Sequence, residues 1–301
     1  MVRAHSVAKR RRVAVFESAL ANIDVVSQLA AFLEAKDLCQ VKSTCKALGA
    51  ACDDAAINGL SIMEEAARRV YEDALDEEKA MLPRYNGESW IEPYHHLLML
   101  RARLTFDQLV GRYIEYRGDK AAVQGKIVNG ESGLSQAICG NHIMRAGKHW
   151  ATFTSSSSFQ DFKSVGVIRP LPGWEKRGLG AFSPAMSDLY ADLLQEQNGR
   201  WDGDVHYCCF SVKYGDCVWY DWTGDRRKVS HWEGNDDYDR RCTALGMLLD
   251  LEEGTLSLYQ NGRRLGTLKD GLAGEYCWIA GFLGKGDLSI RRGYKLDCFS
   301  I

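Results

Sequence analysis

The spacing of hydrophobic residues along the chain changes character near residue 119. Before that point, apolar side chains recur every three or four positions, which is the period of an amphipathic α-helix. After it, short apolar or alternating runs are separated by turns rich in Gly, Asn and Asp, a pattern typical of an all-β domain. The pattern therefore predicts an α+β multidomain chain, with a helical N-terminal region followed by an antiparallel β-sandwich over 119–301.

The clearest β pattern is a hairpin between residues 243 and 268. Leu256 and Leu258 alternate with polar residues, so one face of the predicted strand is apolar. Asn261-Gly262 follows, and this dipeptide is typical of a type I′ turn, in which both central residues take positive φ. Strands are predicted here and elsewhere at Val123–Asn129, Gln136–Ile143, His149–Thr154, Ser164–Arg169, Val205–Val212, Cys217–Trp222, Thr243–Leu251, Thr255–Gln260, Leu265–Leu268, Tyr276–Phe282 and Leu288–Arg291.

Helical segments precede the predicted sandwich. Ser61 is a suitable N-cap for a long run over Ile62–Leu82, and Pro93 opens a second stretch. A third, short piece follows a cap at Thr105 and contains Phe106, Leu109 and Val110. The predicted organisation is a flexible basic tail (1–20), a helical motif (21–60), a helical platform (61–118) and the sandwich (119–301).

One segment between two predicted strands is unusually long. Within residues 171–204, Ser183-Pro184 is followed by apolar residues at helical spacing, and Asn198-Gly199 ends the predicted helix. An insertion of this length either forms a binding feature or covers an open sheet edge. The sequence leaves both alternatives open.

The hairpin also carries a family resemblance. The sequence LLDLEEGTLSLYQNGRRLGTLKDGL, followed by EYCWIAGFLGKGDLSIRRG, resembles the C-terminal half of a SPRY domain, and GKHWATFTS, SVGVIRP and GDCVWYDW extend the likeness upstream. The resemblance implies a bent sandwich of two antiparallel sheets that binds a protein or peptide and has no catalytic residues. It places the ligand on loops at one end of the sandwich, with contacts from Arg169, Pro170, Trp174, Tyr214, Trp222, Leu283 and Gly284.

Aromatic residues gather in or beside these loops. Trp and Tyr anchor peptides well because they bury a large area at low entropic cost. Some of these aromatic residues are expected to be core residues, and Trp219, which lies within a predicted strand, is the first candidate; the group consists of Trp174, Trp201, Trp219, Tyr220, Trp222 and Trp232. Peptide-binding SPRY domains often have Trp where this chain has Leu283, so their ligand preference is not transferred.

A second resemblance concerns the N-terminal helices. The segment IDVVSQLAAFLEAKDLCQVKSTCKALGAACDD is similar to an F-box, although Ile23-Asp24 replaces the usual Leu-Pro start. This resemblance implies docking to a Skp-type adaptor of a cullin–RING ubiquitin ligase. The docking residues would be Ile23, Val26, Leu29, Leu33 and Leu38. The alternative is an ordinary helical cap on the next domain.

Composition and charge narrow the function classes. The formal net charge of −2 gives no overall attraction to nucleic acid or to an anionic membrane, and no apolar run is long enough to span a bilayer. The ten cysteines form no C-x-x-C pair, which favours a reduced protein of the cytoplasm or nucleus. The basic cluster Lys9–Arg12 is either a nuclear localisation signal or a solvated terminus.

Motifs for catalysis and for cofactors are absent from the sequence. It contains neither a GxxxxGKS phosphate loop nor a GxSxG elbow. His95 and His96 point about 100° apart on a helix and have no third ligand at a useful spacing, so no metal is expected. The chain is thus predicted to be an intracellular protein-interaction adaptor and not an enzyme. The F-box resemblance implies the role of a ligase substrate receptor; a non-ligase scaffold and a carbohydrate-binding sandwich are the alternatives.

Overall fold

The computed structural model describes residues 24–26, 33, 35–44, 59–156, 162–224 and 228–293. The chain divides into two compact units, Met1–Arg101 and Ala102–Ile301. The second unit therefore begins before position 119, where the sequence pattern placed the start of the sandwich. The basic cluster Lys9–Arg12 lies outside the described residues.

Unit 1 is helical in its described part. Its helices are α3 (Ala35–Thr44), α5 (Ile62–Glu72), α6 (Asp76–Met81) and α7 (Ile91–Arg101). One core joins α3, α5 and α7, and it includes Leu38, Ile62, Met63, Ala66 and Tyr94. The Tyr94 hydroxyl also donates a hydrogen bond to the Leu33 carbonyl at 2.6 Å, which fixes the segment before α3 against α7.

The long helix predicted over 62–82 is in fact two helices. Its start is as predicted, because the Ser61 hydroxyl accepts the Glu64 N–H at 3.2 Å. The break follows from local hydrogen bonds: the Asp73 N–H closes α5 on the Arg69 and Tyr71 carbonyls, and the Glu78 carboxylate accepts the Leu75 N–H at 3.1 Å to start α6. Leu75 is 63% exposed and does not join the apolar face.

The helical piece predicted after Thr105 is wrong, because the chain forms strands there. They are β1 (Gln108–Val110) and β2 (Ile114–Arg117), with Gly111 at φ +98° between them, a conformation that no α-helix contains. β1 pairs with β4 (Leu134–Ile138) and β2 with β3 (Asp119–Gly125). Pairing with strands later in the chain overrides the local helical pattern.

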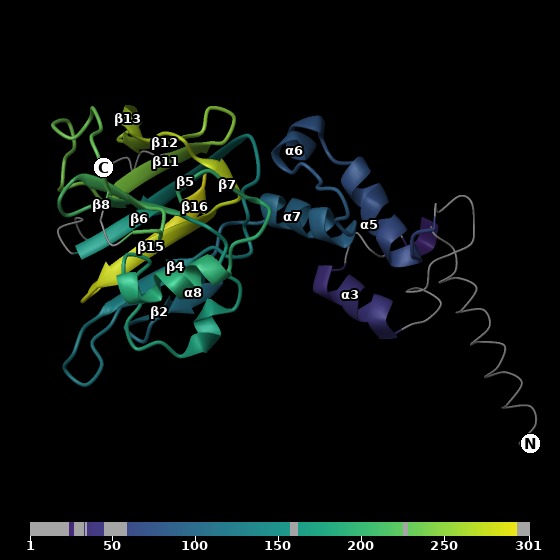
Figure 1. Ribbon diagram of the computed structural model, residues 1–301, viewed down its shortest axis with the longest axis horizontal. Coiled ribbons are helices and arrows are strands. Elements are labelled where there is room, and N and C mark those ends of the chain that lie inside the picture. The colour runs from purple at the N-terminus through teal and green to yellow at the C-terminus, as the bar shows by residue number, and fades with distance from the viewer. Residues whose placement is uncertain are drawn as a thin grey trace, which may run out of the picture. The chain divides into compact units, whose positions relative to one another are not determined.

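Unit 2 is a sandwich of two seven-stranded antiparallel sheets (Figure 1). The first sheet has the order β1-β4-β15-β6-β8-β9-β10, and the second has the order β13-β12-β11-β5-β16-β3-β2. The remaining strands are β5 (Lys148–Thr154), β6 (Phe162–Ile168), β8 (Tyr207–Ser211), β9 (Asp216–Tyr220), β10 (Lys228–Ser230), β11 (Ala244–Asp250), β12 (Thr255–Gln260), β13 (Arg263–Lys269), β15 (Cys277–Leu283) and β16 (Gly286–Arg292), with a small pair of β7 (Trp201–Asp202) and β14 (Ala273–Gly274).

The predicted hairpin is confirmed. β11, β12 and β13 are neighbours in the second sheet, and Asn261 and Gly262 take φ of 49° and 84° at the turn. Leu256 and Leu258 are fully buried in the core between the two sheets, where Phe153 and Trp278 also meet at 6.1 Å between ring centroids. Alternation along the strand thus selects the face that enters this core.

The insertion after β6 covers part of the outer face of the first sheet rather than a sheet edge. It contains short 3₁₀ turns at Trp174–Arg177 and Ser187–Leu189, and helix α8 (Tyr190–Gln195) (Figure 1). Its apolar residues form a second core with side chains of the sheet, and Tyr190 meets Tyr220 at 6.3 Å between centroids. The first sheet is therefore packed on both faces over part of its width.

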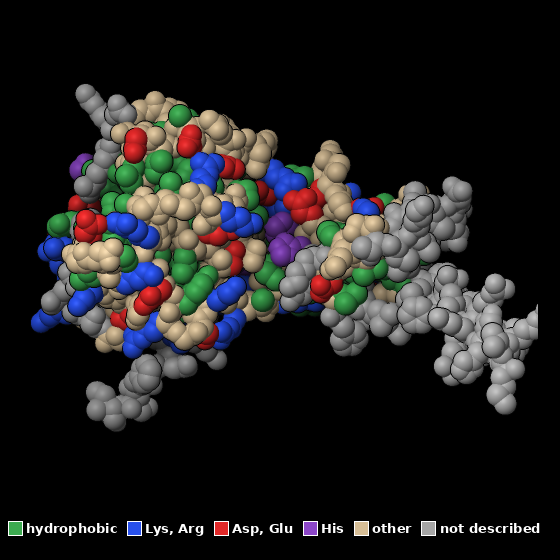
Figure 2. Space-filling model, turned by 90° about the horizontal axis from the view of Figure 1, so that it is seen from below, with side chains coloured by type: hydrophobic (Ala, Val, Ile, Leu, Met, Phe, Trp, Pro, Cys, Tyr) green, Lys and Arg blue, Asp and Glu red, His purple; other side chains and the backbone are tan. Residues whose placement is uncertain are grey.

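The charged side chains of unit 2 form no large patch of one sign on the face seen in Figure 2, because Lys and Arg are intermixed with Asp and Glu there. Among the described helices, none combines the length and the apolar character that crossing a membrane requires.

Candidate ligand groove

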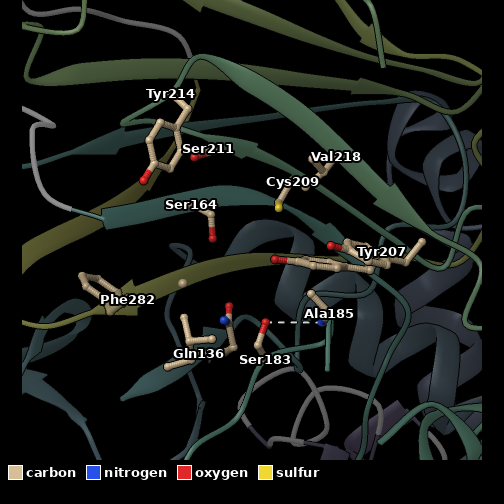
Figure 3. Close-up of a pocket in the computed structure, with 13 residues that line it drawn as sticks. Gln136, Ser164, Ser183, Ala185, Tyr207, Cys209, Ser211, Tyr214, Val218 and Phe282 are labelled. Atoms are coloured by element: carbon tan, nitrogen blue, oxygen red, sulfur yellow. Dashed lines mark hydrogen bonds between the residues drawn. The ribbon is translucent and has the colours of Figure 1, made fainter. Parts of the chain in front are cut away.

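The outer face of the first sheet holds a partly open groove beside the insertion. Its volume is about 180 Å³. Adjacent strands supply the floor, since the backbone register aligns Gln136 of β4, Gly281 of β15, Ser164 of β6 and Ser211 of β8 in one row across the sheet. The row lines the groove throughout (Figure 3).

The walls of the groove come from the insertion and from the turn after β8. Ser183 and Ala185 stand on one side, and the Ser183 hydroxyl accepts the Ala185 N–H at 3.3 Å (Figure 3). The buried Trp222 fixes this wall, because its Nε1 donates to the Pro184 carbonyl at 2.9 Å. Tyr214 lines the groove from the other side and is 47% exposed.

The lining of the groove carries no charge. None of its residues is Asp, Glu, Lys, Arg or His, and its apolar surface exceeds its polar surface. Tyr207 also lines it, and burial raises the pKa of this phenol well above its ordinary value, so it stays protonated at neutral pH. The groove suits an uncharged group, because an ion would lose water there without gaining a partner.

The loop residues predicted as ligand contacts divide into two groups. Tyr214 and Leu283 are 47% and 38% exposed, and Gly284 is half-buried with φ +87°. Leu283 pairs in register with Leu134, which lines the groove, so it lies at the rim. The other predicted contacts are buried inside unit 2 and are not available to a ligand: Arg169, Pro170, Trp174 and Trp222.

Arg169 acts inside the fold rather than at the surface. Its guanidinium donates to the carbonyls of Ala273, Glu275 and Asp202, and it lies 4.2 Å from the ring centroid of Tyr276. Burial lowers its pKa from the ordinary value, while the three carbonyls accept hydrogen bonds from its two terminal nitrogens. Arg169 therefore holds the small β7–β14 pair to the end of β6.

Trp174 and Trp222 likewise hold the insertion in place. Trp174 Nε1 donates to Glu196 Oε1 at 2.8 Å, and the Arg177 guanidinium stacks on its ring at 3.9 Å. Trp219, the first candidate for a core tryptophan, is half-buried and packs against the core between the sheets, whereas the other loop tryptophans are more deeply buried. None of the eight tryptophans is exposed, which removes one of the two observations behind the carbohydrate-binding alternative, the other being the lectin-like shape of a sandwich.

The residues predicted to dock a ligase adaptor lie in or against the core of unit 1 where the structure describes them. Val26 and Leu38 are 2% and 0% exposed, and Leu33 packs against the same core. Ile23 and Leu29 lie outside the described residues. The described part of the predicted docking stripe thus serves as core, because short helices bury their apolar faces against each other first.

One group of side chains has the composition of a metal site. Glu88, Glu92 and His96 offer ligand atoms that lie within 4.8 Å of one another. The expectation that no third ligand lies near the histidine pair is therefore wrong, since an interval of four residues places Glu92 and His96 on one face of α7. Glu88 already accepts the Tyr85 N–H at 3.0 Å, so the fold itself uses this carboxylate.

The cysteines of the described residues are free thiols. Cys208 and Cys217, on neighbouring strands of the first sheet, have sulfur atoms 3.6 Å apart. Burial raises the pKa of Cys139 and Cys277 well above the ordinary value, as expected for small hydrophobic core residues.

Sequence reasoning missed the polar row on the groove floor. Gln136, Ser164 and Ser211 lie within strands that are mostly apolar, in LSQAI, FKSVGVI and YCCFS. A polar residue at a buried strand position is the signal that could have singled them out, because burial of a polar group needs a reason. Their alignment in one row depends on strand order, which the sequence pattern does not give.

Comparison with known proteins finds SPRY domains among the solved structures that are similar to this chain. No family model and no curated protein matches the chain. Among solved structures, the SPRY domain of human HERC1 is similar, with 11% identity, a TM-score of 0.39 and coverage of 63% of this chain and 98% of that one. The TRIM65 PSpry domain is similar with 17% identity and a TM-score of 0.37, over 64% of this chain and 90% of that one. A human SPRY domain is similar with 11% identity and a TM-score of 0.36, over 62% of this chain and 98% of that one. At these scores the likeness assigns the chain to no family.

Proposed function

We propose that unit 2 is a protein-interaction module that binds a segment of another protein in the groove of the first sheet. The observation that carries this proposal is a partly open, uncharged and mainly apolar hollow on a sheet face that the insertion covers in part. A rigid sheet forms its floor, and hydrogen-bonded loop backbone forms its wall. The SPRY resemblance of the sequence agrees with a binding role.

The size of the groove favours a macromolecular ligand over a cofactor. Pockets for small molecules and cofactors usually enclose roughly 300–1,000 Å³. The groove holds about 180 Å³, which is room for one or two side chains of a longer ligand. The exposed Tyr214 and Leu283 lie at its rim and extend the apolar contact area beyond the hollow.

The proposal is tested by filling the groove. Ser164 is half-buried and lines the floor, so Ser164→Tyr occupies the hollow with a side chain of the protein itself. Val229 is 48% exposed on β10 of the same sheet and does not line the groove, so Val229→Tyr is the matched control. Partners captured by the wild-type full chain are identified, purified and titrated against both variants.

We expect Ser164→Tyr to weaken binding of such a partner at least tenfold, a change of about 1.4 kcal/mol, while Val229→Tyr binds as the wild type does. Equal affinity for all three proteins, with unchanged melting temperatures, would show that the ligand binds elsewhere.

The ligase role is a separate proposal that rests on the F-box-like sequence of residues 23–54 alone. Because Val26 and Leu38 are core residues of unit 1, a substitution at either would disturb folding and docking together. Leu29→Asp in the full chain, co-expressed with a Skp-type adaptor, tests docking when the melting temperature of the variant equals that of the wild type. Loss of co-purification supports a substrate-receptor role, whereas an adaptor that never binds the wild-type chain leaves a non-ligase recognition module.

A further inference from the structure

The floor of the groove is polar in a way that packing does not require. Across four neighbouring strands, the register sets Gln136 opposite Gly281, Gly281 opposite Ser164, and Ser164 opposite Ser211. The next row on the same face, two residues away along each strand, is apolar or small. It consists of Ile138, Ile279, Gly166, Cys209 and Val218. One stripe of hydrogen-bonding groups thus crosses an otherwise apolar sheet face.

Gly281 keeps this stripe open. A Cβ atom at this position would lie 2.5 Å from Ser164 Oγ and 2.7 Å from Gln136 Oε1. The amide and the hydroxyl therefore lie directly over the glycine, and any larger residue would displace them. The absence of a side chain at Gly281 leaves room for the Gln136 carboxamide, which points towards Ser164 in Figure 3.

Two atoms of the stripe are buried without a hydrogen-bond partner among the described residues. They are Gln136 Oε1 and Ser211 Oγ, on side chains of residues that are 2% and 9% exposed. Buried polar atoms in native proteins nearly always have partners, so each exception needs an explanation. Rotation about the last bond of a glutamine side chain is soft, and the amide can turn to meet a donor that enters the groove.

The chemistry of the lining restricts what that donor can be. No acidic or basic side chain lines the groove, so a ligand carboxylate or ammonium would be desolvated without a counter-charge. A purely apolar ligand group would fit the walls but would seal Gln136 Oε1 and Ser211 Oγ away from any partner. An uncharged group with N–H or O–H donors satisfies both conditions.

We propose that the groove selects a ligand segment with a carboxamide or hydroxyl side chain, from Asn, Gln, Ser or Thr, flanked by apolar residues. Gln136 accepts the ligand's donor, and the Ser211 hydroxyl makes the second hydrogen bond. This inference rests on the proposed function, because it names the chemistry of the protein segment that the same groove binds.

The test selects peptides without assuming a partner. A phage-displayed library of random heptapeptides is panned on the full-length chain, and phage that also bind Ser164→Tyr are removed. The peptides that remain are synthesised and titrated against the wild type, Gln136→Met and Ser211→Ala. Gln108→Met is the matched control, since Gln108 Oε1 is also buried without a partner but lies outside the groove.

We expect enrichment of Asn, Gln, Ser or Thr and depletion of charged residues at one position of the selected peptides. Gln136→Met should weaken their binding at least tenfold without lowering the melting temperature, because the lost oxygen has no partner in the free protein. Gln108→Met should leave the affinity unchanged. A glutamine that only stabilised the fold would instead lower the melting temperature when replaced.

Two results would overturn the inference, and they are distinguishable. The proposed chemistry is contradicted if the selected peptides need an open groove but carry a charged or purely apolar anchor. It is also contradicted if they bind Gln136→Met as well as the wild type. Either result leaves the binding function unaffected. A library that yields no peptide sensitive to Ser164→Tyr contradicts the binding function itself, and the inference falls with it.

Discussion

Single residues decide where the strands of unit 2 turn. Gly262 is at φ +84° in the turn between β12 and β13, a backbone conformation that costs an L side chain roughly 1–2 kcal/mol. Asn261, at φ 49°, is among the few non-glycine residues that tolerate positive φ. This pair could be read from the sequence because the turn type depends on two adjacent residues and on nothing else.

Gly262→Val should therefore lower the free energy of unfolding by about 1–2 kcal/mol, measured by urea denaturation of the full chain. Gly199→Val is the control, because Gly199 is not in the left-handed region and a Cβ there meets no atom within 4 Å. Equal losses for both variants would show that the backbone strain at Gly262 does not set the cost.

Buried histidines make the stability of unit 2 depend on pH. Burial lowers the pKa of His149 and of His206 to about 4, with nearby Arg169 contributing at His206. Both are neutral in the folded protein at pH 7, and both would be protonated in the unfolded chain below about pH 6.5. Stability is thus full above pH 6.5 and is lost as the pH falls towards 4, by up to about 3 kcal/mol for each histidine.

His206→Phe should remove the contribution of His206 to the loss of stability at low pH. The His206 ring stacks on Trp222 at 5.3 Å between centroids, and Phe keeps that contact without a titrating nitrogen. The difference in unfolding free energy between pH 7 and pH 5 should be smaller for the variant than for the wild type. An identical pH dependence would mean that His206 does not stay neutral in the fold.

At the scale of elements, the sequence predicted what depends on neighbours in the chain and missed what depends on distant ones. The β11–β12–β13 hairpin and the Ser61 cap could both be predicted, because their hydrogen bonds join residues close in sequence. β1 was read as helix because its partner, β4, follows more than twenty residues later. An apolar pattern shows that a face is buried but not which element buries it.

The same distinction explains the candidate site. Tyr214 and Leu283 were predicted as ligand contacts and are exposed near the groove, whereas Arg169, Trp174 and Trp222 were predicted with them and are buried. A bulky side chain beside a turn can anchor a ligand or anchor the turn itself, and the sequence does not separate the two. The polar row of the groove could not be predicted either, because the alignment of its residues depends on the order of the strands.

Arg169 offers a test of this structural role. Its guanidinium reaches three backbone carbonyls, of Ala273, Glu275 and Asp202, which a single ammonium cannot do. Arg169→Lys should destabilise the protein by about 2 kcal/mol through buried carbonyls left without donors. Thermal denaturation measures the loss; a stable variant with weaker partner binding would instead return Arg169 to the ligand-contact role.

At the scale of the whole molecule, each unit has a core of its own, and the two need not share one task. In unit 2 the core between the sheets accounts for the fold, and the second core, under the insertion, positions one wall of the groove. The outer face of the first sheet is therefore neither fully covered nor fully open. That partial cover is the feature from which a binding role is inferred.

The most direct measurement of that role is hydrogen–deuterium exchange of the full chain with and without a partner or selected peptide. Binding in the groove should slow exchange of the backbone amides in residues 183–186 and 212–215, which lie at its walls, and Ser164→Tyr should abolish the effect. Protection confined to the second sheet or to unit 1, with 183–186 and 212–215 unchanged, would contradict the account.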